Sequence, residues 1–194
     1  IDSDAGYFVD SIGASFQTVC EINYTTLSLG STNMSECVSV AGHYSSDSLP
    51  CQLGTYQPFP NQTSCIDSDA GYFVDSIGAS FQTACIAGTF SPLIAAISES
   101  TCSKSPMGSY SLSGSEAPQL APTGFFVDHE GASNPEICPI GTYQNNFGES
   151  KCIKSPRGFF VDQEGASNPE ICPIGTYQSL SLIHISEPTR QEAI

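Results

Sequence analysis

Apolar and polar positions along this chain alternate over very short stretches, without the sustained period of an amphipathic helix before the C-terminal end. Runs of residues typical of β-strands, such as 7–9, 54–56 and 125–127, are bounded by Gly, Pro, Asn and Ser. Short runs bounded in this way predict short β-strands joined by turns. The pattern therefore predicts a small, irregular fold of short β-hairpins.

Two pairs of near-identical segments show that the chain is repetitive. Residues 1–20 recur at 66–85 with one substitution, and residues 124–144 recur at 158–178 with one substitution. All four segments contain the pattern V-D-x-x-G-A-S, in which Asp and Gly occupy the first and fourth positions of an expected type I turn. The acidic residues of this pattern are Asp10, Asp75, Asp128 and Asp162.

A second loop type, Cys-x-x-Gly-Thr-aromatic, alternates with the first and begins at Cys51, Cys85, Cys138 and Cys172. The Gly of this loop is expected at positive φ, and Asn23 takes its place after Cys20. A pair of loops spans 34 residues from Cys138 to Cys172. A unit this short cannot bury a core alone, so we expect residues 1–178 to form tandem cysteine-rich repeats stacked into an elongated rod.

The repeat pattern stops at Ser179. Leu180 to Arg190, LSLIHISEPTR, resembles the conceptual translation of a transposase-based sequencing-library adapter. We therefore interpret residues 179–194 as an adapter-derived, non-biological tail and the whole chain as a fragment of a longer protein.

Charge and composition exclude several functions. The chain has 20 Asp and Glu against 5 Lys and Arg, a net charge of −15, which disfavours binding to nucleic acid or to anionic lipid. It contains no apolar run long enough to cross a membrane. Nine Cys and no Trp indicate a fold held by disulfides in an oxidising, extracellular compartment.

The cysteines are too far apart for a zinc knuckle or a C-x-x-C redox pair. Pairing across the Cys-x-x-Gly/Asn loops gives Cys20–Cys37, Cys51–Cys65, Cys85–Cys102 and Cys138–Cys152, and leaves Cys172 unpaired. Pairing across the other loops gives Cys37–Cys51, Cys65–Cys85, Cys102–Cys138 and Cys152–Cys172. The first register encloses 16, 13, 16 and 13 residues, and the second 13, 19, 35 and 19. The near-constant rings favour the first register, with the second as the alternative.

Two kinds of surface site are suggested by short motifs. Asn23, Asn33 and Asn61 begin N-x-S/T sequons and are candidate glycosylation sites. The acids of an incomplete D-x-D-x-G calcium loop are Asp2, Asp4, Asp67 and Asp69. The equivalent positions of later repeats begin Lys104-Ser-Pro and Lys154-Ser-Pro, so we interpret these acids as solvated turn residues and expect no metal and no cofactor.

Residues 51–65 and 138–152 resemble the cysteine-rich repeats of ephrin-receptor-like ectodomains. They are also similar to the first half-module of tumour-necrosis-factor-receptor repeats, which has a C-x-x-G-x-aromatic opening. The disulfide pairing that this resemblance implies is the first register. The resemblance implies an extracellular, disulfide-stapled rod that serves as a spacer or a binding surface. This chain departs from those families because the next Cys follows 20 residues later in its regular units, and no ligand contact carries over.

No catalytic motif is present: the sequence lacks G-x-S-x-G, a P-loop, H-E-x-x-H and G-x-G-x-x-G, so no enzyme is expected. We expect a fragment of a secreted or cell-surface protein with a structural, spacer or adhesion role. The alternative is a receptor ectodomain that binds a protein ligand. The expected partners are the neighbouring repeats and a protein or glycan ligand, with no nucleic acid and no membrane insertion.

Overall fold

The structure is a computed structural model that describes residues 3–11 and 14–175. Asp2 and the interpretation of residues 179–194 as an adapter-derived tail lie outside the described residues.

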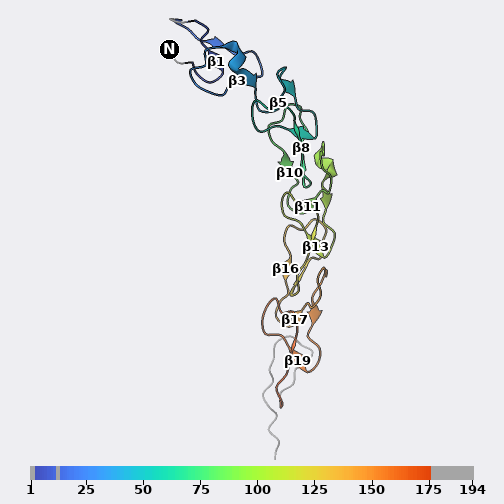
Figure 1. Cartoon of the computed structure of the whole chain (residues 1–194). Coiled ribbons are helices and arrows are strands. Elements are labelled where there is room, and N and C mark those ends of the chain that lie inside the picture. Colours follow the sequence, from blue (N-terminus) through green and yellow to red (C-terminus); the bar gives the residue numbers. More distant parts are fainter. Residues whose placement is uncertain (1–2, 12–13, 176–194) are drawn as a thin grey trace, which may run out of the picture. The chain divides into compact units, whose positions relative to one another are not determined.

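The described residues form ten two-stranded antiparallel hairpins that follow one another in sequence order, each strand pairing with its neighbour in the chain (Figure 1). The strands of the first five hairpins are β1 (Tyr7–Phe8), β2 (Thr18–Val19), β3 (Tyr24–Thr26), β4 (Cys37–Ser39), β5 (His43–Tyr44), β6 (Leu49–Pro50), β7 (Thr55–Tyr56), β8 (Ile66–Asp67), β9 (Tyr72–Phe73) and β10 (Thr83–Ala84). Those of the second five are β11 (Thr89–Phe90), β12 (Ser103–Lys104), β13 (Ser109–Tyr110), β14 (Gln119–Leu120), β15 (Phe125–Phe126), β16 (Glu136–Ile137), β17 (Thr142–Tyr143), β18 (Ile153–Lys154), β19 (Phe159–Phe160) and β20 (Glu170–Ile171).

No α-helix occurs among the described residues, which contain only the short 3-10 turns η1 (Met34–Glu36) and η2 (Glu99–Thr101). The chain divides into two compact units. The first unit comprises Ile1–Cys85 and Ser91–Cys102, and the second comprises Ile86–Phe90 and Ser103–Ile194. The predicted small, disulfide-rich series of short hairpins is confirmed, and the rod remains a prediction from the sequence.

Each hairpin opens with a turn that has a residue at positive φ, which is Gly in every hairpin except β3–β4. The backbone N–H of Tyr72 donates to the carbonyl of Asp69 at 3.1 Å, with Gly71 at φ +85° between them. A positive φ at this third turn position is the requirement of a type II turn. Asn23 has φ +68°, so the expectation that Asn replaces Gly there is confirmed.

The V-D-x-x-G segment does not form the expected turn from Asp to Gly. The N–H of Gly78 donates to the carbonyl of Cys51 at 2.8 Å instead of closing a turn on Asp75. In the first copy the turn bond joins Ala14 N–H to the Ser11 carbonyl at 3.3 Å, one residue later than predicted. The prediction was wrong because the N–H of this Gly bonds to an earlier hairpin, a partner that local sequence does not reveal.

Within each unit, successive hairpins are joined by backbone hydrogen bonds. In the first unit, Gly54 N–H donates to the carbonyl of Val74, and Val74 N–H donates to the carbonyl of Ala96, both at 2.9 Å. In the second unit, Gly124 N–H donates to the carbonyl of Gln144 at 2.7 Å. The turn of one hairpin is therefore held by the residue that follows the first strand of the next hairpin.

The interior contains small side chains at the residue that precedes each turn. Cys51, Cys85 and Cys138 are fully buried at this position, and Ser68 and Ser105 are buried at the same position of intervening hairpins. Small residues fit there because the backbones of adjacent hairpins approach closely enough to bond. An apolar cluster in the second unit comprises Ala121, Val127 and Ala132, with Tyr110 packed against it.

The long interval between Cys102 and Cys138 contains two complete hairpins. These are β13–β14 and β15–β16, and neither is closed by a disulfide. The N–H of Gly108, at the turn before β13, donates to the carbonyl of Val127 at 2.8 Å, as the turn Gly of other hairpins does. The extra length is therefore accommodated as one whole additional hairpin that keeps the hydrogen bonding of its neighbours.

Candidate functional site: the disulfide-closed hairpins

Four of the hairpins are closed by a disulfide between the residue before the turn and a cysteine that begins the second strand or immediately precedes it. The bridges are Cys20–Cys37, Cys51–Cys65, Cys85–Cys102 and Cys138–Cys152, with Cα–Cα distances of 5.7 to 5.9 Å. These are the pairs of the equal-ring register. Cys172 is half-buried and has a free thiol.

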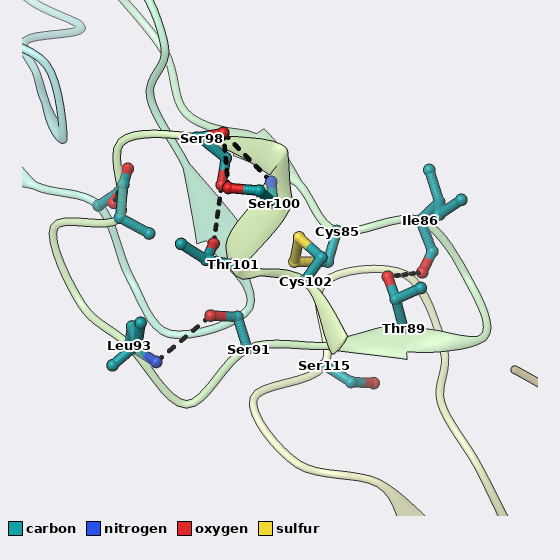
Figure 2. The surroundings of a disulfide bond; sticks show 12 residues. Cys85, Ile86, Thr89, Ser91, Leu93, Ser98, Ser100, Thr101, Cys102 and Ser115 are labelled. Atoms are coloured by element: carbon teal, nitrogen blue, oxygen red, sulfur yellow. Dashed lines mark hydrogen bonds between the residues drawn. A yellow bond between two sulfur atoms is a disulfide. The ribbon is translucent and has the colours of Figure 1, made fainter. Parts of the chain in front are cut away.

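The two larger rings each contain a 3-10 turn just before the second cysteine. Figure 2 shows this arrangement at Cys85–Cys102, where the hydroxyl of Ser98 accepts from Ser100 N–H at 3.2 Å and the Thr101 hydroxyl donates to the Ser98 carbonyl at 2.8 Å. Ser98 is the N-cap of η2. The cap satisfies backbone groups at the helix end and shapes the approach to Cys102.

The two smaller rings instead contain a buried glutamine. The side-chain amide of Gln144 donates to the Lys151 carbonyl at 2.7 Å and accepts from Asn146 N–H at 3.0 Å. Gln57 makes the equivalent bonds to Ser64 and Phe59. The role of these glutamines was not predicted from the sequence, although the repeated C-x-x-G-T-Y-Q pattern is a signal that the glutamine has one.

The calcium candidates Asp4 and Asp69 are engaged by glutamines of their own hairpins. Gln82 donates to the Asp69 carboxylate at 2.6 Å and accepts from Asp69 N–H at 2.7 Å. Gln17 makes the same two bonds to Asp4. Asp67 is exposed in β8, opposite Thr55. Among the described residues, these acids do not gather into a group of three metal ligands.

The three sequon asparagines are all exposed in the first unit. Asn23 and Asn61 have positive φ, at +68° and +58°, and Asn33 caps η1 by accepting from Ser35 N–H at 2.9 Å. The side-chain nitrogens of these asparagines donate to none of the described residues. They are therefore accessible for modification.

A group of three side chains that was not predicted from the sequence lies in the β15–β16 hairpin. Asp128, His129 and Glu136 each offer one ligand atom, and these atoms all lie within 4.8 Å of one another. His129 Nδ1 is 2.7 Å from Asp128 Oδ1, and all three side chains are exposed. Glu136 joins the group because it pairs with Phe126, two residues before Asp128. Strand register rather than sequence spacing brings the three together.

Glu36, at the end of η1, accepts hydrogen bonds that lower the pKa of its carboxyl group. The backbone N–H of Thr32 donates to Glu36 Oε1 at 3.0 Å, and the Thr32 hydroxyl donates to the same oxygen at 3.3 Å. The backbone bond from Thr32 is the main reason that the pKa of Glu36 lies below its ordinary value of 4.5.

The hairpins from β15 to β20 correspond to a known family. Residues 124–172 match the family model described as tyrosine-protein kinase ephrin type A/B receptor-like. This segment is an ephrin-receptor-like cysteine-rich domain. It contains the Cys138–Cys152 bridge, the buried Gln144 and the exposed group at Asp128.

The hairpin geometry of the ephrin-receptor-like domain recurs in the preceding residues, with the same turn glycines and the same kind of ring closure. No curated protein matches the chain. Within the part of the chain that the structure describes, no helix is long and apolar enough to cross a membrane. The match together with the disulfides indicates an extracellular domain.

Proposed function

We propose that this chain is part of a secreted or cell-surface protein in which the cysteine-rich hairpins have a non-catalytic structural, spacer or adhesion role. The observation that carries the proposal is the repeated bond from a turn Gly N–H to the next hairpin, made by Gly54 in the first unit and by Gly124 and Gly141 in the second. Because backbone groups make these bonds, the contact between hairpins tolerates different side chains. A hairpin array of this kind can be lengthened without redesign of its contacts.

The disulfides support the extracellular assignment on physical grounds. The apolar cluster of the second unit contains three small or medium side chains, so little apolar surface is buried. Small modules with so little core depend on covalent closure, which requires an oxidising compartment. The net charge of −15 also suits a solvated extracellular surface rather than contact with nucleic acid.

A receptor ectodomain that binds a protein ligand is the second candidate. The loops expose single phenylalanines, namely Phe16, Phe59, Phe81 and Phe147, each with 64 to 76% of its surface accessible. Exposed aromatic side chains are common anchors in protein interfaces. These phenylalanines favour a ligand-binding role only if they contact the same partner.

Expression of the chain in eukaryotic cells, with and without a secretion signal, tests the proposed compartment. We expect the secreted chain to be soluble, to contain four disulfides and to expose one thiol, that of Cys172. The cytosolic chain should remain reduced. Without disulfides the unfolded state gains entropy and is favoured over the folded state, so the reduced chain should show no cooperative unfolding. A reduced chain with the same cooperative unfolding as the oxidised one would contradict the proposal.

The spacer and receptor roles are separated by the complete reading frame and by a binding test. Long-read sequencing of the transcript should show further hairpin repeats and a surface anchor or secretion signal; an intracellular kinase domain would favour the receptor. In the binding test, the secreted chain is immobilised and presented to intact cells. Attachment that is lost in Phe81→Ser and Phe147→Ser chains of unchanged stability would favour the receptor.

A further inference from the structure

The β15–β16 hairpin carries a cluster of three metal-ligating side chains that neither the disulfides nor the hairpin contacts require. Asp128 and His129 follow the buried Val127, and Glu136 begins β16. One ligand atom from each of the three lies within 4.8 Å of the others. The hairpin thus holds an imidazole and two carboxylates together at its surface.

We propose that Asp128, His129 and Glu136 bind a divalent zinc ion. Zinc accepts imidazole nitrogen together with carboxylate oxygen, at about 2.0 to 2.2 Å from each ligand atom. A tetrahedral ion of this size sets its ligand atoms about 3.4 Å apart. The three side chains are exposed, so small rotations can bring their atoms from within 4.8 Å to that spacing.

Charge also favours a cation at this cluster. The two carboxylates together balance the charge of the ion, and Glu130 adds a further negative charge beside them in the chain. His129 Nδ1 and Asp128 Oδ1 already lie 2.7 Å apart, so the bound ion replaces the proton that they share. Three protein ligands leave the remaining coordination position to water.

The β19–β20 hairpin provides a natural comparison within the same chain. Residues 158–178 repeat residues 124–144 except that Gln163 replaces His129. Asp162 and Glu170 occupy the equivalent positions, both exposed, and Glu170 pairs with Phe160 as Glu136 pairs with Phe126. A neutral amide is a poor zinc ligand beside imidazole. The proposal therefore assigns the site to the first hairpin and not to the second.

The experiment counts zinc ions bound to the oxidised full chain by calorimetry and by competition with a chromophoric chelator. All proteins carry Cys172→Ser, because a free thiolate would itself bind zinc, and a purification tag without histidine. His129→Gln gives the first hairpin the sequence of the second, and Gln163→His does the reverse. Both substitutions therefore produce hairpins whose sequence already exists in the chain. His43 and His184 are present in every variant, so they do not contribute to the differences in zinc binding.

Compared with the parent, we expect one fewer zinc ion on the His129→Gln chain, with affinity at that site reduced at least about tenfold. The Gln163→His chain should bind one more. Zinc should also shift the imidazole resonances of His129 in the parent, whereas an equal concentration of calcium should leave them unchanged. The proposal is overturned if the His129→Gln chain binds as much zinc as the parent, or if Gln163→His adds no site.

Discussion

A Cβ atom placed on Gly124 would lie 2.0 Å from the carbonyl oxygen of Gly165, two hairpins further along the chain. A Cβ atom placed on Gly108 would likewise lie 2.0 Å from the carbonyl oxygen of Gly148. In the first unit, a Cβ atom placed on Gly42 would lie 2.1 Å from the carbonyl oxygen of Gly78. These turn glycines also have positive φ. Glycine is thus required at each of these positions for two reasons: the turn has positive φ, and the backbone of a later hairpin fills the space of a side chain.

Alanine substitutions at Gly124 and Gly158 should separate these two requirements. Both glycines have φ +82°, but no described atom lies within 4 Å of a Cβ placed on Gly158. We expect Gly158→Ala to cost about 1 to 2 kcal/mol, the strain of a left-handed alanine. Gly124→Ala should cost more, because backbone must also move.

The measurement is the free energy of unfolding of the oxidised chains in denaturant. The two glycines begin the same Gly-Phe-Phe-Val-Asp sequence, so each variant is the control for the other. Equal losses at the two positions would mean that the close approach to Gly165 does not constrain the fold.

The disulfide register predicts the products of non-reducing peptide mapping. Linked peptides should contain Cys51–Cys65 and Cys138–Cys152, and a Cys65–Cys85 peptide would contradict the register. Joint substitution of Cys138 and Cys152 by Ser should lower the free energy of unfolding by about 3 kcal/mol, because the unfolded chain gains entropy. Cys172→Ser, which breaks no bridge, should leave it unchanged.

The exposed sequons predict three N-linked glycans on the chain secreted from eukaryotic cells. Thr25→Ala, Ser35→Ala and Thr63→Ala should each remove one glycan, as measured by intact mass before and after enzymatic deglycosylation. These substitutions are preferable to replacement of the asparagines, since Asn23 and Asn61 also satisfy positive φ in their turns. A glycan that persists in the triple variant would show that the assignment is wrong.

Glu36 predicts a stability contribution that depends on pH. Its pKa is lowered in the folded chain, so the contribution is present above the unfolded value of 4.5 and is lost as pH falls through the lower folded value. NMR titration of the side-chain carboxyl should show this lower midpoint in the oxidised chain but not in the reduced, unfolded chain.

Two variants identify the source of the effect. Thr32→Ala removes the hydroxyl bond but keeps the backbone N–H bond, so most of the lowering should remain. The difference in unfolding free energy between the parent and Glu36→Gln should shrink as the pH falls through the folded pKa. A midpoint in the Thr32→Ala chain equal to that of the unfolded chain would assign the effect to the hydroxyl instead.

Local features of the fold were predictable because local sequence produces them. Glycine, or Asn23, occupies the positive-φ position of the turn that opens each hairpin, and the short runs that follow these turns form the strands. Near-constant cysteine spacing favoured one register because a repeated hairpin encloses a repeated length. The composition likewise predicted covalent closure, since nine Cys, no Trp, 17 Gly and 13 Pro favour a cross-linked, turn-rich chain over a large packed core.

Tertiary structure decided everything that depends on how one hairpin meets another. The sequence does not show that the N–H of Gly78 bonds to the Cys51 carbonyl, and that bond is why the expected turn at Asp75 was wrong. Nor does spacing alone place Glu136 beside His129, because strand pairing brings them together. Backbone groups make many of the contacts between hairpins, and nearly every residue has the same backbone groups, so side-chain patterns carry little record of which hairpins touch.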